Sequence, residues 1–576
     1  MEASNPEPRF TLSALAHDAD CAGCWPESGD TLRVRLRCAA GEAARAEACY
    51  RSLYDHVGPY RSVGMAMALS DGVSDVFEAS LTLPDYRFRY YFRLTNRAGE
   101  DLYYTSDGAM DRPPEEGSCF FYPCINPADV PRAPEWAKGA MVYQIWTDRF
   151  FNADLRNDPP GTVPWGAPAG RGVEYGGDFA GIVRQAGYLK GLGVQAVYLN
   201  PVFASPSYHK YDTADYTRVE DCYGGGEGLK ALVAALHGAG IRVILDAVFN
   251  HCSNRHPFFR DLVEKGAASR YRGWFLPRGF PVDEEAVNYD TFAGLVREMP
   301  RWNTANDGVI DYLCGVAEFW TREADLDGWR LDVADELNHR LLRRLRERLE
   351  AVKPDVLLLG EIWNHAHRYV TACQLHAVTN YKFRTAALNF ALQKTGARDF
   401  WNAGQANRMY YRTSTYPLLM NLLGSHDTAR FATLLGDRSA AVALCALLLA
   451  MDGMPMLYYG DEVLMEGGAD PDNRRAMRWD LTQTPEAAEI RALMAFRGQS
   501  ECLRKGSLRL VKAEGGLLAF SRETPGSRLV AAVNFGPEAG LETPGRQLLG
   551  NARTRVGRAE LPRNGYGIWE DESWSG

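Results

Sequence analysis

The sequence has 576 residues, more than one hydrophobic core usually supports, so several domains are expected. Its 46% hydrophobic and 24% charged residues are typical of a globular protein. A net charge of −9, without a large basic stretch, argues against a nucleic acid or an anionic membrane as partner. No apolar run reaches the roughly 20 residues that cross a bilayer, and the acidic start of the chain lacks a signal-peptide layout. We therefore expect a cytoplasmic protein.

The twelve cysteines have no spacing typical of a disulfide framework, which favours reduced thiols. Cys21 and Cys24 form a single CxxC without a second pair at the spacing of a zinc site. We expect ordinary surface cysteines there rather than a metal or redox site.

The first 135 residues are predicted to be all-β. Residues 31–38, 76–83 and 88–95 alternate apolar with polar side chains, as half-buried strands do, and Pro84-Asp85 provides a turn. This pattern predicts a separate β-sandwich over residues 1–135, which ends in a proline-rich linker.

From about Gly139 short apolar segments alternate with segments of helical periodicity. The pattern predicts a (β/α)₈ barrel, of the α/β class, over residues 136–500. In one predicted helix Leu341, Leu342, Leu345 and Leu349 share an apolar face. The eight predicted strands are 141–146, 196–200, 243–246, 328–332, 356–361, 377–381, 418–424 and 455–459.

Two further regions flank this pattern. Residues 251–322, between the third and fourth strands, are too long for an ordinary loop and are predicted to form a small inserted subdomain. Strand patterns return beyond about Ser507, which predicts a C-terminal all-β domain over residues 501–576.

The predicted barrel strands end in polar residues. Catalytic groups of such barrels sit at the C-terminal strand ends, where four strands here bring carboxylates, two histidines and an arginine to one mouth. Two carboxylates can cleave a glycosidic bond, one as acid and the other as nucleophile or base, and a third can bind sugar hydroxyls. The residues are Asp246, His251, Arg330, Asp332, Glu361, His426 and Asp427.

Each of these residues also has a simpler explanation. A single carboxylate at a strand end is more often a helix cap or a surface ion-pair partner. Four aligned strand ends make that explanation improbable for the whole set. Arg330 lies two residues before Asp332, hence on the same face of the strand, and is expected to lower the pKa of Asp332.

The blocks DAVFNH (246–251), GWRLDVADE (328–336), GEIW (360–363) and LLGSHD (422–427) resemble, in order, the four signature regions of the α-amylase superfamily. MPRWNT (299–304), HKYDTADY (209–216), DPDNRRAMRW (470–479) and the extra N-terminal β-domain are similar to its cyclomaltodextrinase, neopullulanase and maltogenic amylase branch.

The resemblance implies a role for each matching residue. Asp332 corresponds to the nucleophile, Glu361 to the proton donor and Asp427 to the third carboxylate. Glu336 and Trp363 fall where the family contacts the acceptor sugar. The other implied residues are Arg330 beside the nucleophile, His251 and His426 on the glucose at the cleavage point, Tyr211 stacked beneath it and Asp246 in support.

The sequence departs from the branch at two places. It has VADE where VANE is frequent, and MPRWNT where MPKLNT is usual. Both changes leave the catalytic set intact and bear on substrate preference.

Hard oxygen ligands suited to Ca²⁺ cluster at Asn152, Asp154, Asn157 and Asp158, although such a cluster by itself is usually a turn. The spacing resembles the calcium loop of the same branch, in which Gly176 and Asp178 complete the site. We expect a structural Ca²⁺.

The resemblance implies a retaining hydrolase of α-1,4-glucosidic bonds, with α-1,6 bonds as a further expectation, in cyclomaltodextrins, maltooligosaccharides and pullulan. Transglycosylation is the expected side activity, and a homodimer the expected assembly. A glucanotransferase or an α-1,6-glucosidase of the same superfamily stays the alternative. A non-catalytic carbohydrate-binding or transporter-associated relative would lack the carboxylates or carry a membrane helix.

Overall fold

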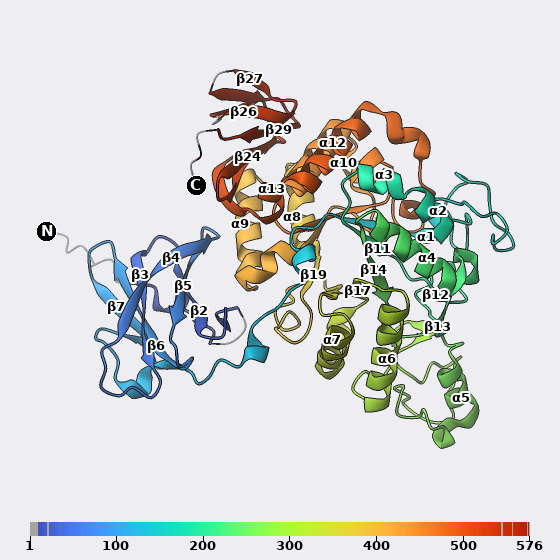
Figure 1. Cartoon of the computed structure of the whole chain (residues 1–576), viewed down its shortest axis with the longest axis horizontal. Coiled ribbons are helices and arrows are strands. Elements are labelled where there is room, and N and C mark those ends of the chain that lie inside the picture. The colour runs from blue at the N-terminus through green and yellow to red at the C-terminus, as the bar shows by residue number, and fades with distance from the viewer. Residues whose placement is uncertain (1–9, 20–21, 543–544, 556, 573, 575–576) are drawn as a thin grey trace. The chain divides into compact units, whose positions relative to one another are not determined.

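A computed structural model describes residues 10–19, 22–542, 545–555, 557–572 and 574 (Figure 1). The chain divides into two compact units. The first comprises Met1–Arg132, His365–Cys373 and Asp399–Tyr416, and the second Ala133–Asn364, Gln374–Arg398 and Pro417–Gly576. In the described part of the chain, no helix combines the length and the apolar character needed to cross a membrane.

The first unit contains the predicted N-terminal β-sandwich, which is confirmed. Its strands pair in the order β1-β2-β5-β4-β3-β6-β7-β8, with β9 on β6. Alternate residues of β2, among them Leu32, Val34 and Leu36, are fully buried and share one core with Tyr90 and Phe92 of β6. The strands are β1 (Cys24–Pro26), β2 (Thr31–Ala39), β3 (Ala43–Ser52), β4 (Arg61–Ser70), β5 (Ser74–Thr82), β6 (Phe88–Asn96), β7 (Asp101–Thr105), β8 (Gly108–Met110) and β9 (Phe120–Tyr122).

Arg35 explains why segment Asp399–Tyr416 clusters with this domain. It belongs to the polar face of β2, yet only 4% of it is exposed. Its Nε donates to Glu78 at 2.8 Å, and its Nη1 donates to the backbone oxygen of Tyr411 at 2.6 Å. A buried guanidinium needs these acceptors, and Glu78 also accepts from the Thr413 hydroxyl at 3.0 Å, so the domain and the segment are held together through a buried ion pair.

The CxxC prediction needs a correction. Cys24 is buried in the sandwich core, where the Tyr90 hydroxyl lies 3.5 Å from its sulfur, so it is not a surface cysteine. Cys21 lies outside the described residues. Other described cysteines, among them Cys38, Cys252 and Cys445, are free thiols.

The second unit contains the predicted (β/α)₈ barrel, which is confirmed, and each predicted strand overlaps an observed one. Eight parallel strands close in chain order. They are β10 (Val142–Ile145), β11 (Ala196–Leu199), β14 (Arg242–Ala247), β17 (Gly328–Leu331), β18 (Leu357–Gly360), β19 (Ala377–Asn380), β20 (Met420–Leu422) and β21 (Met454–Tyr458).

Helices follow most of these strands. In α7, Leu341, Leu342, Leu345 and Leu349 are buried as predicted. Residues 361–376, between β18 and β19, form turns instead of a helix. The helices are α1 (Thr147–Phe150), α2 (Phe179–Arg184), α3 (Ala186–Gly191), α4 (Gly225–Gly238), α6 (Asp307–Glu323), α7 (His339–Val352), α8 (Tyr381–Ala391), α9 (Ala397–Arg408), α10 (Phe431–Leu435), α11 (Arg438–Ala450), α12 (Pro485–Gln499) and α13 (Glu501–Lys505).

The insertion after β14 is shorter than the predicted range 251–322. It holds α5 (Pro257–Lys265) and the hairpin of β15 (Thr291–Phe292) and β16 (Val296–Pro300). The rest of the range is α6, which packs against α7 and leads into β17, so it is a barrel helix. Asn306 starts α6, because its side chain accepts from the backbone N–H groups of Gly308 and Val309. The pair β12 (Phe203–Ala204) and β13 (Asp215–Val219) forms a smaller excursion after β11.

A strand-rich C-terminal domain follows α13. Its five-stranded sheet has the order β22-β23-β24-β29-β26, and a three-stranded sheet has the order β25-β28-β27. Arg522 fixes it to the barrel by donating to the backbone oxygen of Ala450 at 3.0 Å. The strands are β22 (Ser507–Glu514), β23 (Leu517–Thr524), β24 (Ser527–Asn534), β25 (Ala539–Glu542), β26 (Arg546–Gly550), β27 (Arg553–Arg555), β28 (Arg558–Leu561) and β29 (Gly565–Glu570).

Candidate active site

A cavity of about 460 Å³ opens at the C-terminal ends of the barrel strands. Seven of the predicted site residues line it, namely Tyr211, His251, Asp332, Glu361, Trp363, His426 and Asp427. Its wall also includes His209, Phe292, Met299, Val333, Asp335, Asp470 and Arg474. The strand ends therefore meet at one mouth, as their sequence pattern predicted.

Strand register explains why Asp332 and Glu361 are neighbours. Strands β17 and β18 pair in parallel with Leu331 opposite Gly360. The next residue of each strand is a carboxylate, so Asp332 and Glu361 leave the sheet side by side. Both are buried, at 5% and 7% exposure, and both border the cavity.

Arg330 connects three carboxylates. Its Nη1 lies 2.8 Å from Oδ1 of Asp332 and 2.8 Å from Oδ1 of Asp246, and its Nη2 lies 2.9 Å from Oε2 of Glu361. Asp246 is brought there by the pairing of β14 with β17, in which it lies opposite Arg330. The buried guanidinium of Arg330 is thus the shared ion-pair partner of three acidic groups.

The pKa values of Asp332 and Asp427 depend on the balance between burial and neighbouring charges. Burial raises the pKa of Asp332 well above its usual range, and the charges of Glu361, Asp246 and Asp427 act in the same direction. Arg330 lowers the pKa of Asp332, as predicted, but the larger effect of burial outweighs it, so the pKa is raised on balance. Burial, together with Glu361, likewise raises the pKa of Asp427 to about 7. The reason is that one guanidinium is shared among several dehydrated carboxylates.

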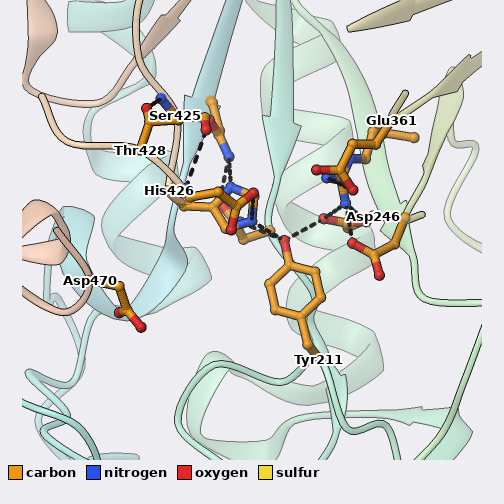
Figure 2. Close-up of polar contacts among 12 residues, drawn as sticks. Tyr211, Asp246, Glu361, Ser425, His426, Thr428 and Asp470 are labelled. Atoms are coloured by element: carbon orange, nitrogen blue, oxygen red, sulfur yellow. Dashed lines mark hydrogen bonds and ion pairs between the residues drawn. The ribbon is translucent and has the colours of Figure 1, made fainter. Parts of the chain in front are cut away.

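Tyr211 and His426 form a stacked pair at the cavity wall, and Figure 2 shows the tyrosine hydroxyl between the histidine and Asp246. Their ring centroids are 5.3 Å apart with 5° between the planes. The hydroxyl lies 2.5 Å from His426 Nε2 and donates to Asp246 Oδ2 at 2.9 Å. Burial lowers the pKa of His426 well below its usual range, so its ring is neutral.

Gln144 sets the tautomer of His426. Its Nε2 lies 2.7 Å from His426 Nδ1, which accepts this bond, so the ring hydrogen sits on Nε2. That hydrogen faces the Tyr211 hydroxyl and Oδ2 of Asp427, which is 3.1 Å away. Sequence reasoning missed Gln144, although it was the lone polar residue of an apolar strand.

His251 and Arg474 complete the wall. His251 Nε2 lies 3.1 Å from the backbone oxygen of Tyr211, and burial lowers the pKa of His251 to about 3, which keeps it neutral. Arg474 lies 2.9 Å from Asp470 and 3.6 Å from Asp427. Sequence reasoning noted the DPDNRR block that carries Asp470 and Arg474 but assigned neither residue a role.

The two predicted acceptor-side residues differ in position. Trp363 borders the cavity with 47% of its surface exposed, stacks on Tyr381 at 3.8 Å and donates to Glu361 Oε1 at 3.1 Å. Glu336 is not part of the cavity wall. It accepts from Asn250 at 3.1 Å and lies 3.4 Å from Arg301.

The loop predicted to bind calcium folds around Asp178, which also caps α2 through the N–H of Gly181 at 2.6 Å. Asp178 accepts from the backbone N–H of Asp154 at 2.8 Å and from Asn157 Nδ2 at 3.3 Å. Asn152 Nδ2 donates to Asp158 at 2.7 Å. The fold therefore gathers the predicted residues around one acidic centre.

Two amide oxygens of this loop suit a hard cation. Oδ1 of Asn152 and Oδ1 of Asn157 are both buried and lack a hydrogen-bond donor. Gly176 has a φ of +79°, and a Cβ there would collide with Asp158 and Asn152. The Asp154 carboxylate faces Arg156 instead, at 2.7 Å, and no three His, Cys, Asp or Glu side chains of the described residues form a metal-type cluster.

Comparisons with known proteins agree with this geometry. Residues 144–500 match the family described as "Alpha amylase, catalytic domain", and residues 10–126 match "Alpha amylase, N-terminal ig-like domain". The chain is 38% identical to a cyclomaltodextrinase of Thermoanaerobacter pseudethanolicus, over 90% of this chain and 92% of that protein. It is 39% identical to neopullulanase 2 of Thermoactinomyces vulgaris, over 91% of each.

A solved structure titled "Cyclomaltodextrinase" superposes with a TM-score of 0.90 at 33% identity, covering 97% of this chain and all of that one. The closed barrel and the N-terminal domain therefore agree with the matched families and with the superposed structure. The chain belongs to the α-amylase family of glycoside hydrolases, among relatives named cyclomaltodextrinase, neopullulanase and maltogenic amylase.

Proposed function

We propose that this enzyme hydrolyses α-1,4-glucosidic bonds, and α-1,6 bonds as a further activity, in cyclomaltodextrins, maltooligosaccharides and pullulan. Retention of configuration follows from double displacement, with transglycosylation as the side activity. The observation that carries the proposal is the placement of Asp332 and Glu361 on adjacent strand ends, both bonded to Arg330. The names of the relatives support the substrate class.

Each chemical step uses these two carboxyl groups. The Asp332 carboxylate attacks the anomeric carbon while the Glu361 carboxyl gives its proton to the departing glycosidic oxygen, which forms a glycosyl ester. Glu361, now a carboxylate, removes a proton from water, and the resulting attack on the anomeric carbon releases the sugar and frees Asp332. When a sugar hydroxyl replaces water, the same step is transglycosylation.

The surrounding residues bind and orient the sugar. Tyr211 offers a ring face on which the glucose at the cleavage point can stack, and His251 and His426 are neutral, so they can hydrogen-bond to hydroxyl groups. Asp427 accepts hydroxyl hydrogens, and its negative charge favours the oxocarbenium-like transition state. Asp246 holds Tyr211 and Arg330 in place.

Calcium is proposed as a structural ligand of the loop after β10. The two unpartnered oxygens of Asn152 and Asn157, with the carboxylates of Asp158 and Asp178 and the backbone at Gly176, would hold it. The ion would join this loop to the start of α2. No chemical step needs it.

A homodimer and a cytoplasmic location complete the proposal and rest on the family resemblance alone. Analytical ultracentrifugation at several protein concentrations tests the first. A monomer at every concentration would contradict it. Fractionation of cells of the source organism, followed by detection of the protein, tests the second.

The decisive experiment is a product time course on β-cyclodextrin, pullulan and soluble starch, with Asp332→Asn in parallel. Fast ring opening to maltose and glucose that disappears in the variant is the expected result. Mainly longer transfer products would favour a glucanotransferase, and cleavage confined to isomaltose-type substrates would favour an α-1,6-glucosidase. Proton NMR of the first product tests retention, because the newly released sugar must be the α-anomer.

A further inference from the structure

A second cavity, of about 530 Å³, lies in the same unit as the active-site cavity but shares none of its wall residues. Its wall comes from the loop after β10 and from Trp479, beyond β21. Strands β10 and β21 are neighbours in the barrel, so the cavity lies at the same C-terminal rim. The proposed reaction does not use it.

Two tryptophans of this wall, Trp165 and Trp479, present apolar surfaces, and Tyr175, with 1% of its surface exposed, packs edge-on against Trp165. The polar atom of each ring already bonds to the backbone: Trp165 Nε1 to Met477 at 3.0 Å, Trp479 Nε1 to Phe150 at 2.9 Å, and Tyr175 Oη to Ala167 at 2.8 Å. Trp165 nevertheless has 37% of its surface exposed, and neighbouring Leu155 has 75%. Because these bonds hold the rings in place, a ligand would meet a preformed surface and lose little affinity to side-chain ordering.

A hydroxyl acceptor lies beside the rings. Asn152 and Asp158 of this wall belong to the proposed calcium loop, which leaves Thr162 to contact a ligand. The Thr162 hydroxyl donates to the backbone oxygen of Pro159 at 2.8 Å, so its own oxygen can accept a further hydrogen. The wall thus combines apolar faces with an acceptor, which suits an uncharged ligand that has C–H faces and hydroxyl donors.

A pyranose ring has these properties. The cavity is also larger than the 460 Å³ active-site cavity, so size does not exclude a sugar. A chain of ring contacts links the two: the Arg149 guanidinium lies 4.9 Å from the Tyr175 ring and 5.7 Å from the Trp146 ring, and Trp146 meets His426 edge-on at 5.9 Å. We propose that this second cavity binds a glucosyl or maltosyl unit of an α-glucan, separately from the active site; the choice of α-glucan rests on the proposed function.

The test is calorimetric titration of the full-length Asp332→Asn protein with maltotriose, in buffer containing calcium. Two classes of binding site are expected. Adding Trp165→Ala should weaken one class about tenfold or more and leave the other unchanged, because it removes a stacking face. Phe319→Ala is the matched control, since Phe319 is an aromatic residue with 47% exposure on α6, outside both cavities, and both classes should persist.

Leu155→Ala tests the same cavity if the Trp165→Ala protein does not fold. Leu155 is mostly exposed, so its replacement should leave Tm unchanged and weaken the same class about twofold. A single class of sites, or two classes that neither substitution affects, would overturn the inference. If the wild-type enzyme still opens β-cyclodextrin, that result leaves the proposed function intact. Conversely, binding that depends on Trp165 without turnover of any α-glucan would overturn the proposed function alone.

Discussion

Nη2 of Arg330 lies 2.9 Å from Oε2 of Glu361. The same guanidinium bonds to Asp332 through Nη1, so the proposed nucleophile and the proposed acid share one cation. A planar guanidinium holds the carboxylates at fixed positions through two nitrogens, whereas an ammonium group is a point charge on a flexible stem. This geometry leads to the first prediction.

Arg330→Lys should abolish most activity and destabilise the fold. It keeps one positive charge but loses the Nη2 contact to Glu361, so a buried carboxylate loses its ion-pair partner, which costs about 3 kcal/mol of unfolding free energy. We expect a lower Tm in calorimetry and a fall in kcat of about 100-fold or more, because Asp332 and Glu361 lose their common orientation. Arg343→Lys, at an exposed position of α7, is the control and should change neither quantity. Wild-type kcat in Arg330→Lys would refute the role assigned to the guanidinium.

Substitutions of the two central carboxyl groups should separate their roles. Asp332→Asn should lower kcat by about 10⁴-fold or more on every substrate, because the attacking oxygen is lost. Glu361→Gln should be equally damaging on maltotriose but far less so on α-glucosyl fluoride, whose leaving group needs no proton. Asp335→Asn, another carboxylate of the cavity wall, should lower kcat by less than about tenfold. Equal damage by Glu361→Gln on both substrates would contradict its role as acid.

Asp427→Asn should stabilise the protein at high pH and not at low pH. Burial, together with Glu361, raises the pKa of Asp427 to about 7, from a usual value of 3.8. The folded state therefore holds this proton more tightly than the unfolded state, so stability falls as pH rises from 4 to 7 and stays lower above 7. The difference in Tm between variant and wild type should grow over that interval. A difference that is independent of pH would refute the raised pKa, and kcat/KM should drop because the charge is lost.

Calcium should raise Tm, and a chelator should lower it. Asn157→Ala should remove this response, because it deletes a buried amide oxygen that lacks a donor. Asp154→Asn should retain the response, since that carboxylate faces Arg156. The measurement is the Tm of each variant by calorimetry, with Ca²⁺ and with EDTA. A response lost in Asp154→Asn and kept in Asn157→Ala would assign the ligands the other way round.

Local pattern was sufficient for the barrel and for most of the candidate site. Each strand is a short apolar run followed by polar residues. Parallel pairing of neighbouring strands then suffices to place Asp332 beside Glu361. The insertion was less predictable, because the apolar face of α6 has the same periodicity whether it packs on the barrel or on a subdomain. Gln144 escaped notice, and Arg474 received no role, because a polar residue acquires its role from the residues that contact it in the fold.

The sequence by itself determined the order of elements and the identity of the polar groups at the barrel mouth, since both follow from periodicity and motif. Tertiary structure decided the electrostatics. The pKa of Asp332 depends on how much water and how many carboxylates surround it, and neither quantity is a property of neighbouring residues in the chain. The same holds for Arg35, whose place on a polar strand face predicted exposure, but whose acceptor at Tyr411 lies hundreds of residues away and buries it.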